Sequence, residues 1–307
     1  MNRSKVGSRM SERGFIVVAT LWLLAALAGL ILVGSLYMTQ SAIALSAFDA
    51  ATQLQMISTG GVELAAYQLS GVAPEARPSR GSFTFRLANA RVAVEYQSEA
   101  ARINLNMAPR SFIAGLFAAL GVGSDAAGQL ADRVAAWRNP PRQNFQDEED
   151  SRYAAAGLKY RPRHAAFSNI DELSLVMGMP PELVERARPY LTLYSGIAGI
   201  NVLEAAPEVL AALPDMTSAK ADAFLNQRDS LSSKDPDFVL GILGGRVAGA
   251  TVAVGNAYRI RMRIILPDGR DSRSEGVIML PDRGTKSAYR VFTWRDEIDP
   301  STGGAQR

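Results

Sequence analysis

An acidic run is the part of the sequence whose residue types most directly suggest chemistry. In the segment QDEEDSRY, consecutive acidic residues extend from Asp147 to Asp150. Carboxylates are the hard oxygen ligands that Ca²⁺ prefers, so a calcium site is one interpretation. The spacing differs from that of an EF-hand, and a run of like charges is also typical of a solvated loop. The residues alone leave both interpretations open.

Side chains for other kinds of catalysis are scarce. The chain has no cysteine and one histidine, His164. Disulfides, cysteine-ligated zinc and thiol catalysis are therefore excluded. A catalytic triad needs a carboxylate that orients the histidine, and nothing local in the sequence suggests one for His164. We predict that the protein is not an enzyme, has no catalytic residues and requires no cofactor.

The N-terminal segment has the features of a membrane helix. No residue between Phe15 and Met38 is charged. At ~1.5 Å per residue this run reaches ~36 Å as a helix, which is enough to cross a ~30 Å hydrocarbon core. The apolar part of a secretion signal is usually only ~7–15 residues long, so we expect this run to remain in the protein. Basic residues favour a cytoplasmic N-terminus for it, namely Arg3, Lys5, Arg9 and Arg13.

The rest of the chain alternates between helical and strand patterns. Apolar residues continue at helical spacing from Ile43 to Leu69. Alternating patterns predict strands at Phe83–Leu87 and Arg91–Gln97, and further strands follow residue 246 around the turn Pro267–Arg270. Residues 100–245 are almost wholly helical by pattern. The fold class is therefore α+β, with a large all-α domain inserted into a small antiparallel sheet.

Two segments of this helical region resemble each other. Ile103–Gly121 and Ile200–Asp215 both contain Ile-Asn, then Ala-Pro, then the start of a helix, and a third helical pair covers Phe167–Leu193. The pattern resembles helix-hairpin-helix units, which bind DNA through glycine-rich turns and nearby cations. Here the turns contain aspartate or proline, and without the basic leader the chain is nearly neutral. We therefore expect no nucleic-acid partner.

The junction between charge and hydrophobicity is informative. A basic leader, Gly14 and then the apolar Phe15 resemble the site cut by prepilin peptidase in type IV pilin-like proteins. That enzyme cleaves after the glycine and methylates the new N-terminus. Ala19 then occupies the fifth mature position, where most pilins and pseudopilins have a glutamate that pairs with the subunit above. Because a subunit with nothing above it has no such partner, Ala19 favours a place at the filament tip.

The order of the later segments indicates which family of pilin-like proteins the chain resembles. ARINLNMAP, VAAWR, EDSRYAAAGLKYRPR, FSNIDELSLVMGM, RPYLTLYS and INVLEAAPEVLAAL occur in the order found in the K component of the type II secretion system, a minor pseudopilin. The resemblance runs from Gly14 to about Arg228. It implies a pilin-like long N-terminal helix and sheet, I and J minor pseudopilins as partners in a tip complex, and contacts with the major pseudopilin. It also implies cleavage by prepilin peptidase and a role in starting pseudopilus assembly and exporting folded proteins across the outer membrane.

The same resemblance refines the calcium hypothesis. Glu149, Asp150 and Tyr153 match an E-D-x-x-Y element of a helical domain that binds calcium in this family. The family's upstream acids are absent, since Trp137 is followed by RNPPRQN. Calcium binding through Glu149 and Asp150 is therefore possible rather than required, and Trp137 is expected in the core.

The resemblance also sets the expected organisation and location. We expect an inner-membrane protein with one span, a cytoplasmic N-terminus and periplasmic C-terminal domains. The alternative is a tip minor pilin of a type IV pilus or a DNA-uptake machine. The expected parts are a leader at 1–14, a transmembrane or filament helix at 15–38, the rest of the long helix and the first strands at 39–99, the inserted helical domain at 100–245, the remaining strands at 246–295 and a tail at 296–307.

Overall fold

The computed structural model describes residues 9–140, 148–231, 235–245, 247–281 and 288–298. It divides the chain into two compact units, residues 1–56 and 57–307. The long helix α1, Arg9–Ser70, contributes to both. In the first unit, Phe15–Ser41 has a mean hydropathy of 2.8 and is long and apolar enough to cross a membrane. The apolar helix is thus slightly longer than the stretch 15–38 expected from the sequence.

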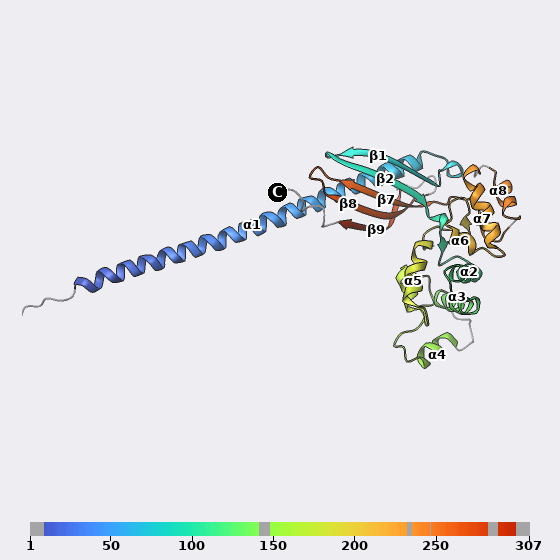
Figure 1. Cartoon of the computed structure of the whole chain (residues 1–307), viewed down its shortest axis with the longest axis horizontal. Helices are drawn as coiled ribbons and strands as arrows, with labels where there is room; N and C mark the ends of the chain where they lie inside the picture. The colour runs from blue at the N-terminus through green and yellow to red at the C-terminus, as the bar shows by residue number, and fades with distance from the viewer. Residues whose placement is uncertain (1–8, 141–147, 232–234, 246, 282–287, 299–307) are drawn as a thin grey trace, which may run out of the picture. The chain divides into compact units, whose positions relative to one another are not determined.

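A five-stranded antiparallel sheet forms one layer of the second unit (Figure 1). Its strands lie in the order β1-β2-β7-β8-β9, so the strands on either side of the long helical segment are neighbours. The fold is α+β, as predicted. The strand bounds are β1 Arg80–Leu87, β2 Ala90–Ser98, β7 Ala257–Ile265, β8 Asp271–Met279 and β9 Arg290–Ile298.

Alternating side chains explain why one face of this sheet is buried. Val92 and Val94 of β2, with Ile260 and Ile264 of β7, are almost inaccessible to solvent. Successive residues of a strand point to opposite faces, so the residues between them form the other face. The C-terminal part of α1 supplies buried partners within the same unit, which are Ile57, Val62, Ala65, Ala66 and Leu69.

Helix α1 packs closely against the sheet at Gly61. A Cβ atom on Gly61 would lie 2.4 Å from Sδ of Met262 in β7, so glycine permits the observed packing distance. A buried hydroxyl contact adds polar specificity, since Ser58 Oγ and Ser274 Oγ are 3.1 Å apart. The two-residue turn between β1 and β2 uses the left-handed conformation at Ala88 (φ 48°) and Asn89 (φ 63°), which suits a tight hairpin.

The helices that follow β2 lie together beyond one end of the sheet (Figure 1). They are joined by short 3₁₀ helices: η2 Glu99–Ala101, η3 Ile170–Leu175, η4 Arg188–Tyr190 and η5 Arg228–Ser230; η1, Pro74–Ala76, instead precedes β1. The α-helices are α2 Arg110–Ala119, α3 Ser124–Arg138, α4 Glu148–Ala155, α5 Pro181–Ala187, α6 Pro207–Ala211, α7 Ser218–Gln227 and α8 Pro236–Ile242.

Short strands within this region differ from the expectation of an almost wholly helical segment. Two parallel two-residue pairs occur, β3 with β4 and β5 with β6. Two residues per strand are too few to produce an alternating pattern in the sequence. The bounds of these strands are β3 Ile103–Asn104, β4 Leu191–Thr192, β5 Ile200–Asn201 and β6 Ala250–Thr251.

The two similar sequence segments adopt the same local geometry. Each Ile-Asn pair forms a short strand, β3 or β5, and the next residue donates a backbone hydrogen bond to the paired strand. These bonds are 2.8 Å from Leu105 N to Thr192 O and 2.9 Å from Val202 N to Thr251 O. Each asparagine also accepts a 3.0 Å bond at Oδ1 from the backbone N–H two residues later.

An arginine completes each copy of this arrangement. Arg138, the last residue of α3, donates from Nη2 to Ala108 O at 2.6 Å and from Nη1 to Leu105 O. Arg228, which follows α7, donates from Nη1 to Ala205 O at 2.6 Å. Ala108 opens the Ala-Pro step of the first copy, whereas Ala205 lies one residue before the Ala206-Pro207 step of the second. The repeat therefore consists of a strand, two helices and an arginine that ties the second helix back to the loop before the first.

The C-terminal strand extends further than expected. β9 continues to Ile298, so residues 296–298 belong to the sheet and not to the tail predicted at 296–307. Its register explains this, since Ser272 pairs with Ile298 and Arg273 with Glu297. Residues 299–307 lie outside the described part of the chain, as do residues 1–8 of the predicted leader.

Candidate processing site, metal site and buried charge network

The predicted processing site lies within a helix. Gly14 and Phe15 are both part of α1, which begins at Arg9. The Phe15 side chain is 75% exposed, and Ala19 is also exposed. The apolar side chains of Phe15–Ser41 are open to the surroundings, with none of the most apolar window buried. A helix with this surface needs an apolar environment, either lipid or other apolar helices.

The acidic element predicted to bind calcium begins helix α4. Glu149 is buried, and its Oε2 lies 3.2 Å from Nη1 of Arg152. Arg152 also pairs with Glu148 at 2.8 Å. Three acids in the first turn of a helix favour its N-terminus, because the helix dipole is positive there. Helix formation therefore accounts for part of this acidic run.

Asp150 has basic neighbours from a later segment. Its Oδ1 lies 3.0 Å from Nε2 of His164, and its Oδ2 lies 3.5 Å from Nη1 of Arg161. Nδ1 of His164 lies 3.2 Å from the carbonyl oxygen of Asn139. The sequence suggested no carboxylate near His164, but the loop brings Asp150 to it. The left-handed backbone of His164 (φ 52°) directs the chain through this turn.

These contacts bear on the calcium hypothesis. Both carboxylates that we expected to bind Ca²⁺, those of Glu149 and Asp150, lie beside an arginine, Arg152 and Arg161 respectively. Across the residues that the structure describes, no three acidic or histidine side chains are grouped as a metal ion would require. Asp147 falls in the segment 141–147, outside those residues. The described side chains do not fit a calcium site by themselves, and calcium binding stays a prediction.

The aromatic residues beside this element form core, as predicted for Trp137. The Trp137 ring stacks on Phe167, with centroids 6.1 Å apart and planes 24° apart, and lies 6.3 Å from Tyr153. The Tyr153 hydroxyl accepts a 2.7 Å hydrogen bond from the Met177 N–H and donates to Leu175 O at 3.4 Å. Burial raises the pKa of Tyr153 to about 12.

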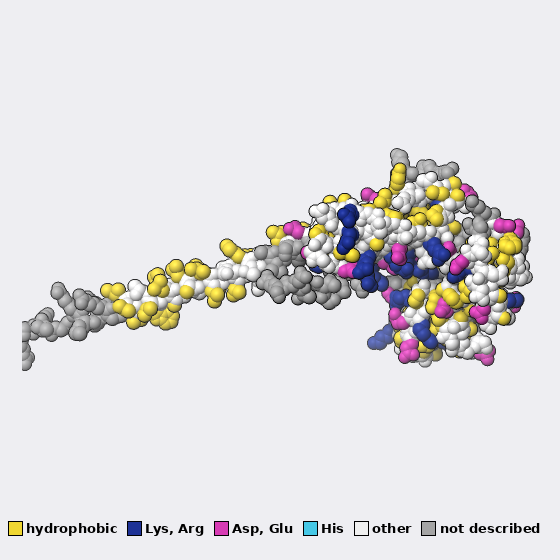
Figure 2. All heavy atoms as spheres, turned by 45° about the horizontal axis from the view of Figure 1, so that its top comes forward, with side chains coloured by type: hydrophobic (Ala, Val, Ile, Leu, Met, Phe, Trp, Pro, Cys, Tyr) yellow, Lys and Arg dark blue, Asp and Glu magenta, His cyan; other side chains and the backbone are white. Residues whose placement is uncertain are grey.

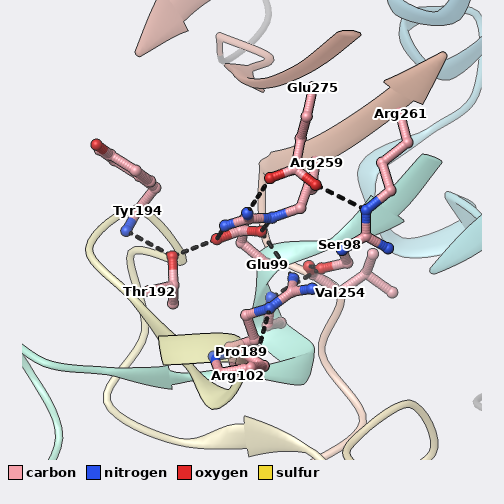
Figure 3. A network of polar contacts seen from close by, with 11 residues as sticks. Ser98, Glu99, Arg102, Pro189, Thr192, Tyr194, Val254, Arg259, Arg261 and Glu275 are labelled. Atoms are coloured by element: carbon pink, nitrogen blue, oxygen red, sulfur yellow. Dashed lines mark hydrogen bonds and ion pairs between the residues drawn. The ribbon is translucent and has the colours of Figure 1, made fainter. Parts of the chain in front are cut away.

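A buried charge network joins the sheet to the helical region (Figure 3). Its centre is Glu99, which follows β2 and is inaccessible to solvent. Glu99 Oε1 accepts hydrogen bonds from Arg102 Nη1 at 2.9 Å and from Arg259 Nε at 2.8 Å. Thr192 of β4 donates its hydroxyl proton to Oε2 of the same carboxylate. One carboxylate thus connects η2, β7 and β4.

A second carboxylate extends the network across the sheet. Glu275 of β8 lies 2.5 Å from Nη1 of Arg259 and 2.7 Å from Nε of Arg261. Arg102 in turn donates from Nε to the carbonyl oxygen of Pro189 at 3.0 Å. Since buried charges are stable only when paired and hydrogen-bonded, these contacts hold the two regions in one relative position.

The pKa values in this network follow from burial and pairing. Burial lowers the pKa of Arg102, against the opposing effect of the Glu99 charge. Burial also disfavours the charge of Arg259, but hydrogen bonds to Glu99 and Glu275 outweigh it, so the pKa of Arg259 is raised. For Glu275, the unfavourable effect of burial is outweighed by Arg261 and Arg259, which lower its pKa. For Arg259 and Glu275, the paired partners therefore favour the charged form despite burial.

Sequence reasoning did not identify this network. Glu99 and Arg259 are 160 residues apart, and neither belongs to a recognisable motif. The sequence did contain one indication of the network, because charged residues alternate with apolar ones within a predicted strand. Arg259 and Arg261 alternate with the buried residues Tyr258, Ile260 and Met262.

Comparison with known proteins identifies part of the chain. Residues 85–196 match the family model of type II secretion system (T2SS) protein K. We call this segment the protein K domain, after the family that it resembles. It includes the last three residues of β1, all of β2, the acidic element and the Glu99, Arg102 and Thr192 members of the buried network. Arg259 and Glu275 lie outside the matched residues, although they contact the protein K domain directly.

A solved structure has the same overall fold. A chain of the crystal structure of the GspK–GspI–GspJ complex of the type 2 secretion system of enterotoxigenic Escherichia coli matches with a TM-score of 0.58. The match covers 82% of this chain and 98% of that chain at 18% sequence identity. Because 82% of the chain is covered, the likeness in fold extends well beyond residues 85–196. A search of curated proteins found no match.

Proposed function

We propose that the protein is a minor pseudopilin at the tip of a type II secretion pseudopilus, where it initiates assembly and helps to export folded proteins across the outer membrane. The protein K domain at residues 85–196 carries this proposal. The proposed partners are I and J minor pseudopilins in the tip complex and the major pseudopilin below it. A pseudopilin has a structural role, so no catalytic activity is expected.

The tip position is supported by the bulk and the chemistry of the chain. The helical region between β2 and β7 enlarges the C-terminal unit, and a large head is difficult to accommodate inside a packed shaft. Ala19 provides no carboxylate for a subunit above. The exposed apolar side chains of Phe15–Ser41 suit packing among other apolar helices or in the inner membrane. The proposed orientation places the N-terminus in the cytoplasm and residues 57–307 in the periplasm.

Co-purification tests the function. The full chain should be produced in a strain with the type II secretion apparatus, extracted from membranes in mild detergent and captured by a C-terminal tag. We expect I and J pseudopilins to be recovered in equal proportions with the chain. Recovery of type IV pilus subunits instead would favour the alternative, a tip minor pilin of a pilus or DNA-uptake machine. Recovery of neither set would contradict assembly into either filament.

The mature N-terminus tests processing separately. Mass spectrometry of the membrane-extracted protein should show loss of residues 1–14 and a methylated Phe15. A protein that still begins at Met1 in a strain with active prepilin peptidase would contradict the pilin-like interpretation. Because this measurement does not depend on partners, it distinguishes failure of processing from failure of assembly.

A further inference from the structure

The sheet face opposite the buried core is rich in arginine. Along β7 and β8, the residues that alternate with buried ones include charged residues that are exposed or half-buried. Figure 2 shows basic side chains gathered over the middle of this part of the molecule, with fewer acidic ones among them. The arginines that the strand register places on this face include Arg80, Arg86, Arg91, Arg259, Arg261, Arg263, Arg273 and Arg295.

One row across this face neutralises itself. The register aligns Glu95 of β2, Arg261 of β7, Glu275 of β8 and Arg295 of β9 side by side. The charges alternate along the row, which stabilises the sheet because opposite charges lie directly across from each other. Glu275 nevertheless pairs with Arg261 and Arg259 in preference to Arg295.

The neighbouring rows lack this balance. Arg86 lies directly opposite Arg91, and Arg263 directly opposite Arg273. Like charges at such positions destabilise a sheet. Asp271 pairs with Arg263 at 2.6 Å, and Glu297, whose side chain is not described, lies opposite Arg273. The face therefore has more cationic than anionic groups among its described side chains.

Several of its arginines form no ion pair within the described structure, and two of these suit a mutational test. Arg91 and Arg295 form no ion pair with any described carboxylate, although both are exposed at the surface. Either arginine can therefore be replaced by a neutral residue without leaving a described carboxylate unpaired. Both also have room for a ligand, since Arg91 borders a pocket at the β1–β2 turn and Arg295 lines two grooves.

These two grooves share part of their lining. One, of about 540 Å³, lies over the sheet, and the other, of about 300 Å³, lies between the sheet and the helical region. They share Arg261, Glu275 and Arg295. Beside the second groove, Tyr194 stacks on Phe292 of β9, with centroids 5.1 Å and planes 14° apart. Phe292 is 37% exposed, so an aromatic surface borders the arginines.

We propose that this arginine face binds an acidic polypeptide segment of another protein, one that carries several carboxylates and an aromatic residue. Arginine pairs with carboxylates in a two-pronged geometry, and its planar group also stacks on aromatic rings. A single phosphate would occupy only one part of a surface that crosses several strands. The aromatic pair Tyr194–Phe292 provides a contact that a small inorganic anion cannot use. The inference goes beyond the proposed assembly role and does not rest on it.

Fluorescence anisotropy with the full chain in detergent micelles tests the proposal. The probe is a labelled peptide of alternating Glu and Tyr, compared with one of alternating Glu and Ser. We expect the Tyr peptide to bind more tightly, and binding to weaken as salt is added. The double variant Arg91→Gln/Arg295→Gln should weaken binding of the Tyr peptide roughly tenfold or more, because each arginine loses its charge-assisted hydrogen bonds to a carboxylate.

A control variant removes two positive charges from a different part of the surface. Arg186→Gln/Lys220→Gln changes two exposed cations of the helical region and should leave binding within about twofold of the unmodified protein. Equal losses in both double variants would show non-specific attraction and overturn the proposal. Full displacement of the peptide by an equal charge of inorganic phosphate would also overturn it, in favour of a small-anion site. Protection of β9 amides from hydrogen exchange on peptide binding would support it.

Discussion

Nε of Arg259 donates a 2.8 Å hydrogen bond to Oε1 of Glu99, which lies 160 residues earlier in the chain. This contact joins the strand that follows the helical region to the turn that precedes it. Because Glu99 also binds Arg102 and Thr192, the entry, the interior and the exit of the inserted region meet at one carboxylate. The relative position of sheet and helices therefore depends on a small set of buried charges.

Neutralising this carboxylate should strongly destabilise the fold. In Glu99→Gln, Arg102 and Arg259 would remain buried while losing the negative charge that compensates them. Removing one partner of a buried ion pair costs about 3–5 kcal/mol. We expect a decrease of about 3 kcal/mol or more in the free energy of unfolding, measured by urea denaturation of the detergent-solubilised protein.

An exposed ion pair provides the control for this variant. Asp132 pairs with Arg110 at the surface, where Arg110 Nη2 lies 2.8 Å from Asp132 Oδ2. Exposed pairs contribute about 0–1 kcal/mol, so Asp132→Asn should have a small effect. A similar loss in both variants would contradict a special role of burial at Glu99.

The two arginines of the internal repeat, Arg138 and Arg228, should contribute differently to the free energy of unfolding. Arg138 is half-buried and donates to the carbonyl oxygens of Leu105 and Ala108, whereas Arg228 donates to that of Ala205. Burial lowers the pKa of Arg138, which reflects the removal of its charge from water. We expect Arg138→Ala to reduce the free energy of unfolding by about 2–3 kcal/mol and Arg228→Ala by about half as much. Chemical denaturation of both variants measures the difference, and equal losses would contradict it.

Alkaline pH should destabilise the helical region through Tyr153. Burial raises its pKa from 10.0 to about 12, so the folded protein favours the neutral phenol. The stabilisation from this neutral group is fully present below pH 10 and is lost as the pH rises through about 12. The Tyr153→Phe variant cannot ionise, and its melting temperature should fall less steeply between pH 10 and 12. Parallel profiles for the two proteins would show that Tyr153 does not contribute to this loss.

Calcium binding can be tested at the acidic element. Binding would require Glu149 and Asp150 to exchange their contacts with Arg152, Arg161 and His164 for the ion. We expect any stabilisation by millimolar Ca²⁺ to be abolished by Asp150→Asn and retained in Asp132→Asn, measured as a shift of the melting temperature. The absence of a shift in the unmodified protein at saturating Ca²⁺ would contradict the calcium prediction.

Periodic features were accessible from the sequence alone. Alternating residues in β2 and β7 predicted strands, and the repeated Ile-Asn and Ala-Pro steps marked two segments that adopt one geometry. These features succeed because local hydrogen bonding and one-sided burial impose a period on the chain. The strand bounds still shifted, as β1 begins at Arg80 rather than Phe83, since cross-strand pairing with Gln97 extends it.

Contacts between distant segments could not be predicted from the sequence. The parallel pairs β3–β4 and β5–β6 contain two residues per strand, too few for a period to show. Nothing local in the sequence suggested a carboxylate for His164, because its position beside Asp150 depends on how the later segment folds back onto α4. The Glu99 network likewise depends on tertiary pairing of strands far apart in the sequence. The partners of Glu99 could therefore be recognised only once the order of the strands in the sheet was known.

The junction at Gly14 leads to the prediction with the largest functional effect. In the proposed processing the peptidase cuts after Gly14, so Gly14→Val should leave the leader attached. The retained basic residues would hold this end at the cytoplasmic side of the membrane, because moving a charge into the hydrocarbon core costs at least about 2.5–3.5 kcal/mol. The uncut chain could then not leave the bilayer to enter a filament.

The readout has two parts. N-terminal mass spectrometry should show an uncut chain, and secretion of folded substrates into the medium should stop in cells that carry only the variant. Ser8→Val changes a leader residue away from the junction and should leave both cleavage and secretion intact. Normal secretion by an uncut Gly14→Val protein would contradict the proposed pseudopilin role, because only a processed subunit can pack its apolar helix into the pseudopilus.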